Sequence, residues 1–248
     1  MLDVLSLSCE KNGKLILDTV TAHVKRGRIT ALLGKNGSGK TTLLRCLCRE
    51  ISYGGCVRIA GRDTAEMTPR ERALALSYLP QLLPTPHLTV RELVGLGRSP
   101  YLSLLARPSE SDRAAVLSAM HRTEIASLAE RDLLSLSGGE RQRAFLAMML
   151  AQGTPLLLLD EPTSYLDATA RRALLSLLAS LVNTEEKTIL TVLHDVNDAV
   201  RLADDILLLD NGRLAFQGSK EDFLAAGLPE RHFGLTRVGN DGGLPFFY

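Results

Sequence analysis

The sequence has no tryptophan, and only 4% of its 248 residues are aromatic. So few rings argue against the stacking platform on which single-stranded nucleic acids bind. Charge of one sign is not concentrated anywhere either: the formal net charge is +1, and no block of five or six like charges occurs. These two absences argue against a nucleic-acid partner and against binding to an acidic lipid surface.

The four cysteines form no C-x-x-C pair and have no His-rich segment beside them. We therefore interpret them as reduced thiols that pack as small hydrophobic groups. The N-terminus lacks the basic start and apolar core of a signal peptide. No stretch approaches the ~18 apolar residues of a membrane span, so a soluble, cytoplasmic chain is expected.

Strand-like and helix-like segments alternate through most of the chain, and hydrophobic residues make up 45% of it, enough for a substantial core. Strands are expected over residues 3–8, 28–34, 54–61, 74–80, 155–160, 188–193 and 205–210. Helices are expected over residues 39–50, 140–152, 169–182 and 195–203. Several strands are apolar on both faces, which is typical of a parallel sheet covered by helices. The pattern predicts a doubly wound α/β core.

Three further segments differ from this alternation. Residues 82–136 contain four prolines and helical stretches around 89–97 and 110–129, which we interpret as a mostly helical insertion. The dipeptide Asn211-Gly212 between two strand-like runs predicts a two-residue hairpin. The tail after about residue 225 has little pattern.

The segment "GKNGSGKT", Gly34 to Thr41, fits G-x-x-x-x-G-K-[ST] between a buried strand and a helix. Glycines allow backbone N–H groups to surround phosphate oxygens, and the following helix presents its positive end. Lys40 can reach the β- and γ-phosphates, and the Thr41 hydroxyl can ligate Mg²⁺. A glycine turn that binds no ligand would rarely match this motif and also lie between a buried strand and a helix.

The segment "LLLLDE", residues 156–161, supplies two acids at the end of a buried strand. Asp160 can hold Mg²⁺ directly or through water. Glu161 points to the other side and could polarise an attacking water. A strand-end acid pair alone is a weak signal, but beside a phosphate-binding loop it becomes a strong one.

The segment "LSLSGGERQR", residues 134–143, contains a second glycine pair at the start of a helix. Ser137 and Glu140 have capping-box spacing, which explains both of these residues. Capping does not explain Gly138 and Gly139, which cost stability in a first helical turn. They permit close backbone approach, and the positive end of a helix favours an anion there. The phosphate-binding loop already accounts for one ATP, so the simplest use of a second anion site is in another copy of the chain. The pattern therefore predicts two ATP molecules sandwiched between two copies of the chain.

Taken in order, the motifs "GKNGSGKTT", "YLPQ", "LSGGERQR", "LLLLDEPTSYLD" and "VLHD" resemble those of the ATP-binding cassette (ABC) ATPases from about residue 2 to 220. The resemblance implies an α/β P-loop NTPase core with an N-terminal antiparallel β subdomain and an inserted helical subdomain. It implies one ATPase domain over residues 1–248, with the helical subdomain at about 82–152 and a C-terminal tail at about 225–248. ATP and Mg²⁺ would be its cofactors.

The resemblance also implies roles for single residues. Catalysis would involve Glu161, His194, Lys40 and Gln81, and Mg²⁺ would meet Thr41, Gln81 and Asp160. Asp167 would lie in a loop that contacts the partner protomer. Nucleotide would contact two segments: Gly34, Lys35, Asn36, Gly37, Ser38, Gly39, Lys40, Thr41 and Thr42, and, from the other protomer, Ser137, Gly138 and Gly139.

His194 also has a case of its own, because it follows a buried strand at the position where α/β sheets place ligand contacts. The other histidines, His23, His87, His121 and His232, have no such context, and we interpret them as surface or packing residues. Two departures from the family pattern stand out. No aromatic residue precedes Tyr53, so adenine would be held weakly, over the stem of Lys11. Met148 replaces a common arginine, with little expected effect.

The segment "TVRELVGLGRSPY", residues 89–101, resembles the ATPases of iron-siderophore, haem and cobalamin importers. An ATPase of this class acts as a homodimer, peripheral on the cytoplasmic face of the inner membrane. It would contact permease subunits through about residues 82–105 and a periplasmic or extracellular binding protein indirectly, with no nucleic acid involved. Two alternatives stay open: a soluble cofactor-assembly ATPase without a permease, and an importer ATPase for another solute. Intact Lys40, Asp160, Glu161 and His194 argue against a binding module without turnover.

Overall fold

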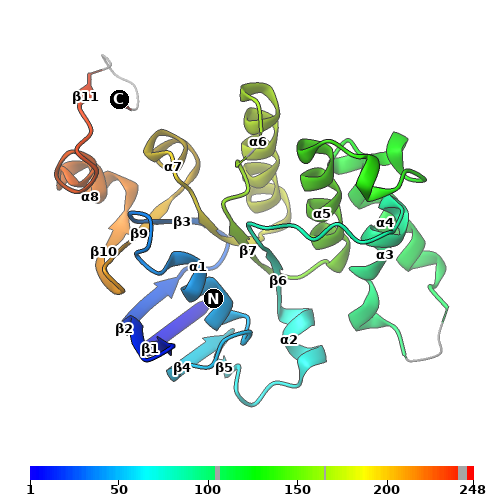
Figure 1. Cartoon of the computed structure of the whole chain (residues 1–248), viewed down its shortest axis with the longest axis horizontal. Helices are drawn as coiled ribbons and strands as arrows, with labels where there is room; N and C mark the ends of the chain where they lie inside the picture. Colours follow the sequence, from blue (N-terminus) through cyan, green and yellow to red (C-terminus); the bar gives the residue numbers. More distant parts are fainter. Residues whose placement is uncertain (104–106, 165, 240–244) are drawn as a thin grey trace. The chain divides into compact units, whose positions relative to one another are not determined.

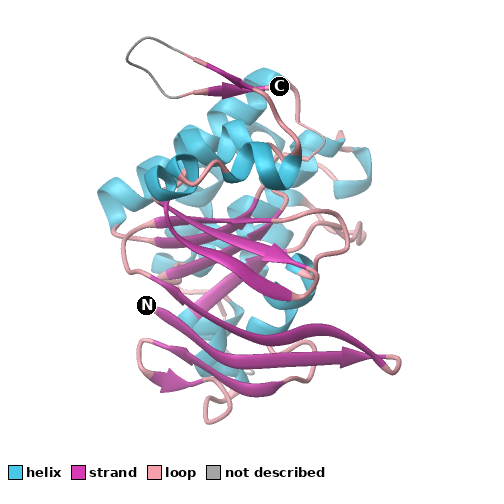
Figure 2. Cartoon of the chain, turned by 90° about the vertical axis from the view of Figure 1, so that its left-hand side faces the viewer, coloured by secondary structure: helices cyan, strands magenta, loops and turns pink. Residues whose placement is uncertain are grey.

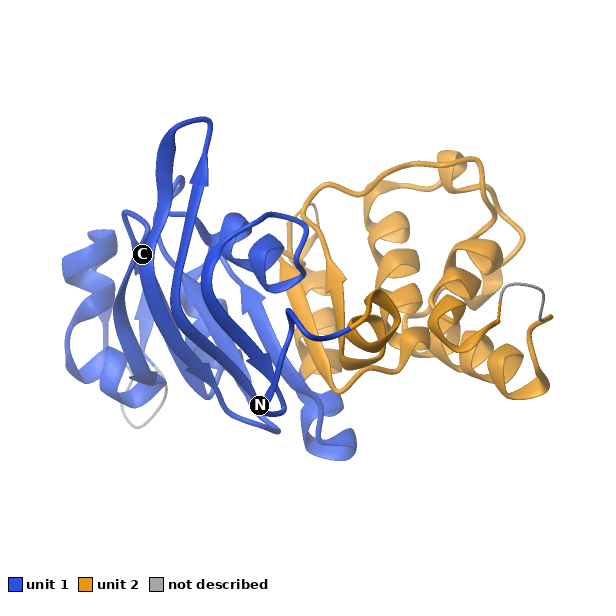
Figure 3. Ribbon diagram, turned by 90° about the horizontal axis from the view of Figure 1, so that it is seen from below, with its two compact units in different colours: residues 1–67, 179–248 blue, residues 68–178 orange. Residues whose placement is uncertain are grey.

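The computed structural model describes residues 1–103, 107–164, 166–239 and 245–248 (Figure 1). It divides into two compact units, drawn in different colours in Figure 3. Unit 1 comprises residues 1–67 and 179–248, and unit 2 comprises residues 68–178. Helix α6 (Ala168–Glu185) contains the second boundary. The chain therefore leaves unit 1 after Met67 and returns to it within that helix.

Unit 1 begins with an antiparallel sheet of strand order β2-β1-β4-β5, whose long strands start near the N-terminus in Figure 2. Its members are β1 (Leu2–Lys11), β2 (Lys14–Val24), β4 (Gly54–Ile59) and β5 (Arg62–Asp63). Buried and exposed residues alternate along β4, as expected for a sheet with one covered face. The predicted N-terminal antiparallel subdomain is therefore confirmed, although the pattern had not revealed β2.

The second sheet of unit 1 has the order β10-β9-β3-β8. It consists of β3 (Ile29–Leu33), β8 (Thr188–Val192), β9 (Asp205–Asp210) and β10 (Arg213–Ser219). Strand β3 is parallel to both β8 and β9, and every residue of β3 and β8 is buried. Strands β9 and β10 pair at Asp210 and Arg213, which confirms the hairpin at Asn211-Gly212. Helices α1 (Lys40–Leu47) and α7 (Val196–Leu202) belong to the same unit.

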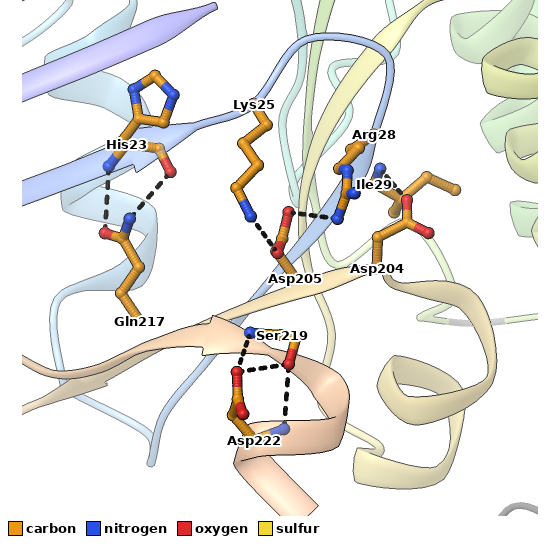
Figure 4. A network of polar contacts seen from close by, with 9 residues as sticks. All are labelled: His23, Lys25, Arg28, Ile29, Asp204, Asp205, Gln217, Ser219 and Asp222. Carbon is orange, nitrogen blue, oxygen red and sulfur yellow. Dashed lines mark hydrogen bonds and ion pairs between the residues drawn. The ribbon is translucent and has the colours of Figure 1, made fainter.

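A polar network ties the start of β9 to the segment that joins β2 and β3 (Figure 4). The Lys25 ammonium donates to Asp205 Oδ1 at 3.0 Å, and Arg28 Nη1 lies 3.5 Å from Asp205 Oδ2. The Asp205 side chain is only 9% exposed. Nearby, the Gln217 amide exchanges two hydrogen bonds with the backbone of His23. The network thus links strands of the two sheets within unit 1.

The C-terminal tail is more ordered than its sequence indicated. Helices α8 (Lys220–Ala225) and α9 (Leu228–Phe233) are followed by strands β11 (Arg237–Val238) and β12 (Phe246–Phe247), which pair with each other. Phe247 is 2% exposed. The Asn197 side chain on α7 both donates to and accepts from the Phe247 backbone, at 3.0 and 2.8 Å. The end of the chain is thereby fastened to α7.

The cysteines are free, and Cys9 and Cys46 are buried. Burial raises the pKa of the Cys46 thiol to about 12 and raises that of Cys48 as well. These thiols therefore stay protonated at neutral pH and lack the thiolate that metal binding and redox chemistry use. This agrees with their interpretation as packing residues.

Unit 2 holds two parallel strands, β6 (Leu76–Leu79) and β7 (Leu156–Asp160), in register at Leu79 and Leu159. Its helices are α2 (Pro69–Ala75), α3 (Val90–Leu96), α4 (Glu110–Arg122) and α5 (Gly138–Gln152). Short turns of 3₁₀ helix lie at Ser99–Tyr101, Ala126–Leu128 and Leu133–Ser135. Three of the helices, α3, α4 and α5, form the inserted helical part.

Two boundaries differ from the sequence prediction. The strand expected over 74–80 begins only at Leu76, because α2 ends at Ala75; its capping box, Thr68 with Glu71, had been overlooked. The helix expected over 110–129 ends at Arg122, since Glu124 adopts a left-handed φ of 55° that no α-helix continues through.

We predict that Asp205→Asn lowers the free energy of unfolding by about 1–3 kcal/mol, because it removes a nearly buried carboxylate that two cations share. Urea denaturation monitored by circular dichroism measures this. Glu186→Gln is the matched control: its carboxylate lies 3.8 Å from Arg26, and both side chains are more than three-quarters exposed. It should cost less than about 0.5 kcal/mol. Equal losses would contradict a special role for the network.

Candidate functional site

The segment Gly34–Thr41, here called the phosphate loop, joins β3 to α1 in unit 1. Three of its glycines have positive φ: Gly34, Gly37 and Gly39. A Cβ on Gly34 would stand 2.3 Å from the carbonyl oxygen of Leu209, so no larger residue fits there. The backbone conformation of the loop therefore depends on glycine, as the motif predicted.

Polar groups in this loop are arranged around an interior that suits an anion. Lys40 is 6% exposed, and its ammonium donates to the carbonyl oxygens of Gly34 at 2.7 Å and Lys35 at 3.0 Å. The Ser38 hydroxyl is buried and has no hydrogen-bond partner in the described part of the chain. Burying such a group without a partner is costly. Phosphate oxygens would give the Ser38 hydroxyl a partner and could accept from the Lys40 ammonium in place of the two carbonyls, so these residues fit the nucleotide that the motif implies.

His194 follows β8, and the phosphate loop follows the neighbouring strand β3. Because these strands are parallel and in register at Leu32 and Val192, their carboxyl ends lie at the same edge of the sheet. His194 is exposed there. Unit 1 thus places the phosphate loop and His194 at one sheet edge, where α/β proteins bind ligands.

Unit 2 brings Gln81, Asp160 and Glu161 together after β6 and β7. The Gln81 amide donates to Glu161 Oε2 at 2.7 Å. The Asp160 carboxylate, on a residue 1% exposed, accepts a bond from the Tyr78 hydroxyl at 3.3 Å. Gln81, Asp160 and Glu161 line a cavity of about 270 Å³ that also reaches Gly138 at the start of α5. No role was predicted for Tyr78, although it is the first residue of the motif "YLPQ" that ends in Gln81.

Glu161 has a left-handed backbone, with φ of 52°. Non-glycine residues seldom adopt this conformation, and where they do they are concentrated at functional sites. Besides Gln81, the Ser164 hydroxyl donates to the same carboxylate oxygen at 3.3 Å. The Glu161 carboxylate is thus held in one direction by two neighbours, which the motif alone could not indicate.

The start of α5 has the predicted cap. Ser137 and Glu140 form a complete capping box, and the Ser137 hydroxyl, as the largest influence, lowers the pKa of Glu140. Neither Gly138 nor Gly139 has positive φ. A Cβ on Gly138 would meet nothing within 4 Å, and one on Gly139 would meet only a Leu166 side-chain atom at 3.4 Å. Among the described residues of unit 2, therefore, no neighbour requires glycine at either position.

Asp167 immediately precedes α6, and its Oδ1 accepts from the backbone N–H groups of Thr169 at 2.9 Å and Ala170 at 2.8 Å. This carboxylate thus has a local capping role. It also lines a cavity of about 590 Å³ with Ser137, Gly138 and Gly139. The loop that contains it is next to the start of α5.

The segment 82–105, expected to contact a permease, presents two apolar side chains strongly to solvent: Leu82, 78% exposed, and Leu96, 52% exposed. Val90 and Val94 are buried in the helix core. Arg98 is held inside unit 2, with its side chain only 14% exposed. Residues 104 and 105 of this segment lie outside the described residues.

Two smaller expectations concern adenine and metal. Lys11 is exposed at the end of β1, and its contact with adenine stays a prediction. Within the described residues, no group of three or more His, Cys, Asp or Glu side chains is arranged to hold a metal. Mg²⁺ commonly binds one or two carboxylates together with substrate phosphates, so Asp160 suits it without such a group.

A family model described as "ABC transporter" matches residues 17–164, more than half of the chain. The chain belongs to the ABC transporter family. This ABC ATPase is 40% identical to the probable siderophore transport system ATP-binding protein YusV of Bacillus subtilis over 233 residues. These residues cover 93% of the chain and 85% of that protein. It is also 40% identical over 222 residues to the ferric enterobactin transport ATP-binding protein FepC of Escherichia coli, over 89% and 82%.

Solved structures agree. This ABC ATPase superimposes on a transporter described as metal-chelate type, in an inward-facing conformation, with a TM-score of 0.84 and 27% identity over 100% of the chain and 96% of that one. A dimeric ATP-binding cassette, MJ0796, with ADP and phosphate gives a TM-score of 0.78 and 27% identity over 89% and 99%. The fold class predicted from the sequence is confirmed, and the chain is an ATP-hydrolysing cassette. No helix among the described residues is long and apolar enough to cross a membrane.

The two glycine sites should respond oppositely to alanine in the absence of nucleotide. Gly34→Ala should lower the free energy of unfolding by about 1–3 kcal/mol or more, because its Cβ meets a backbone carbonyl at a positive φ. Gly138→Ala should leave stability unchanged or raise it by up to ~1 kcal/mol, because alanine favours the helix. Thermal unfolding compares them. A destabilised Gly138→Ala would mean that this glycine serves the fold itself.

Proposed function

We propose that this chain energises a membrane importer for iron-siderophore complexes or a related metal chelate such as haem or cobalamin. The observation that carries the proposal is 40% identity over about nine-tenths of the chain to import ATP-binding proteins for such solutes. The segment "TVRELVGLGRSPY" points to the same class. The solute itself is recognised elsewhere, because an ATPase subunit of this kind does not touch it.

ATP binds at the phosphate loop. Backbone N–H groups of residues 34–39 surround the phosphates, the Lys40 ammonium turns from its two loop carbonyls to the β- and γ-phosphate oxygens, and Ser38 gains a partner. The remaining loop positions, Lys35, Asn36 and Thr42, border the nucleotide. Thr41, Gln81 and Asp160 would supply the oxygen ligands that Mg²⁺ prefers, and an ion held there would offset negative charge on the phosphates.

Hydrolysis uses the Glu161 carboxylate to orient and polarise the attacking water. The Gln81 bond at 2.7 Å keeps this carboxylate aimed before nucleotide arrives. His194 contacts the γ-phosphate, and Lys40 offsets the negative charge that grows as the bond to the leaving group breaks. The chemistry therefore depends on placing charged groups around the phosphate more than on covalent steps.

Two copies of the chain close on two ATP molecules. Ser137, Gly138 and Gly139 at the positive end of α5 approach the nucleotide that the other copy holds. The open space around Gly138 supports this, because no described residue of its own unit lies within 4 Å of where its Cβ would be. Asp167 lies beside these residues and contacts the partner protomer.

The homodimer works at the cytoplasmic face of the inner membrane as a peripheral subunit. Permease chains bind about residues 82–105 of the helical subdomain (about 82–152), where Leu82 and Leu96 offer apolar surface. An external binding protein delivers the solute and is reached only through the permease. The alternatives are a soluble cofactor-assembly ATPase without a permease and an importer ATPase for another solute.

Glu161→Gln should bind ATP, accumulate as a closed dimer and hydrolyse ATP about 10²–10⁴-fold more slowly, because the amide cannot accept a proton from water. Phosphate release and size-exclusion chromatography with ATP measure both effects. Adding Ser137→Ala and Gly138→Asp to this variant should abolish the dimer while nucleotide binding persists. Wild-type turnover in Glu161→Gln would remove this residue from its role, and dimers in the combined variant would contradict the sandwich.

The importer assignment is tested by affinity purification of tagged Glu161→Gln from detergent-solubilised native membranes in the presence of ATP. Mass spectrometry should find a polytopic permease among the co-purifying proteins, and radioactive uptake of ferric siderophores should require the chain. Recovery of soluble partners only, with the chain absent from membranes, would favour the assembly ATPase. A permease that moves another solute would correct the substrate class alone.

A further inference from the structure

A compact cluster of polar contacts, here called the Arg98 cluster, joins the end of α3 to α4 and α5. It consists of Gly97, Arg98, Tyr101, Asp112 and the backbone of Ala151 and Gln152. The Arg98 guanidinium donates to Asp112 Oδ1 at 2.9 Å and to the Ala151 carbonyl at 2.8 Å. The two side chains are 14% and 8% exposed. Bonds from Ser109 and from Arg98 lower the pKa of Asp112 to about 2, so the pair is ionised at neutral pH.

Tyr101 and Gly97 complete the cluster. The guanidinium carbon of Arg98 lies 3.7 Å from the centroid of the Tyr101 ring, and the Tyr101 hydroxyl donates to the Gln152 carbonyl at 2.8 Å. A Cβ on Gly97 would stand 2.3 Å from the Met148 carbonyl, so the backbones of α3 and α5 are in direct contact. Arg98 therefore binds the last turn of α5, where helix carbonyls carry partial negative charge.

The cluster extends to α2 and β6 as well. Arg70 on α2 donates to the Pro100 carbonyl at 2.7 Å, and the Gln152 amide donates to the Leu76 carbonyl at 3.2 Å. Strand β6 leads to Gln81. Arginine suits this position because its planar fork makes two bonds in fixed directions while its face stacks on a ring, which lysine cannot do.

We propose that Arg98 and Tyr101 are positioning residues that make α3 and α5 move together. The inference rests on the proposed function. Helix α3 belongs to the permease-facing segment, and the other end of α5 carries Ser137, Gly138 and Gly139, about 22 Å away at 1.5 Å per residue. The Arg98 cluster fixes the end of α3 to the end of α5. A displacement of α3 by the permease therefore moves the ATP-binding end of α5, and closure of the dimer on ATP moves α3.

Hydrogen–deuterium exchange tests this on the whole chain without a permease. In Glu161→Gln, ATP should slow exchange roughly tenfold both at residues 137–142 and at α3. With Arg98→Lys added, slowing at residues 137–142 should persist, while slowing at α3 should fall below about twofold. Tyr101→Phe removes one hydrogen bond, so the slowing of exchange at α3 should be intermediate between that in Glu161→Gln alone and that with Arg98→Lys added. Arg98→Lys keeps a cation beside Asp112 and so avoids leaving a buried charge unpaired.

The matched control is Arg91→Lys, in α3 but away from the cluster at its end, where Arg91 pairs with the 74%-exposed Glu130. Added to Glu161→Gln, this substitution should leave the ATP-dependent slowing of exchange as it is in Glu161→Gln alone. If ATP slows exchange at α3 as much with Arg98→Lys as without it, the coupling is overturned. It is overturned as well if the slowing is lost both at α3 and at residues 137–142, because a residue with only a structural role would affect both segments. If ATP slows nothing at residues 137–142 in Glu161→Gln itself, the proposed function fails and the coupling fails with it.

A second readout uses the assembled transporter. Arg98→Lys should hydrolyse ATP within about twofold of wild type as an isolated chain and should still co-purify the permease, while uptake falls by about tenfold or more. Uptake and isolated ATPase activity that fall in parallel would contradict a positioning role. Unchanged uptake would contradict it as well.

Discussion

The structure depends on strands that are buried on both faces. No residue of β3, β7 or β8 is exposed, so these strands consist almost entirely of apolar and small side chains. Charged groups that act on phosphate can therefore stand only where the strands end. The phosphate loop and His194 occupy such ends in unit 1, and Gln81, Asp160 and Glu161 occupy them in unit 2. Burial, which stabilises the sheet, thus also decides where its chemistry occurs.

Much of this arrangement could be predicted from the sequence, because its signals are local. The phosphate loop needs glycine at fixed positions, and a run such as "LLLLDE" announces both a buried strand and the acids at its end. The capping box at Ser137 is equally local. What escaped prediction depends on distant contacts. Segment 74–80 is apolar enough to resemble one strand, and Asn197 gives no sign that it will hold the last strand of the chain.

Side-chain direction was the second limit. The motifs indicated that Gln81 and Glu161 matter, but not that one donates to the other or that Tyr78 meets Asp160. Arg98 shows the same limit. In the sequence it stands within a segment expected to meet a permease, whereas in the structure its guanidinium is directed at α4 and α5. The position of Arg98 in that segment therefore did not reveal that its side chain is used inside unit 2.

The left-handed backbone at Glu161 costs stability at a position where the side chain is proposed to take part in hydrolysis. Any non-glycine residue in that conformation stores strain, of order 1–3 kcal/mol in sparsely populated regions. Glycine at this position would relieve the strain and remove the carboxylate at the same time. Thermal stability alone would therefore favour glycine at this position, at the loss of the carboxylate that Gln81 and Ser164 hold.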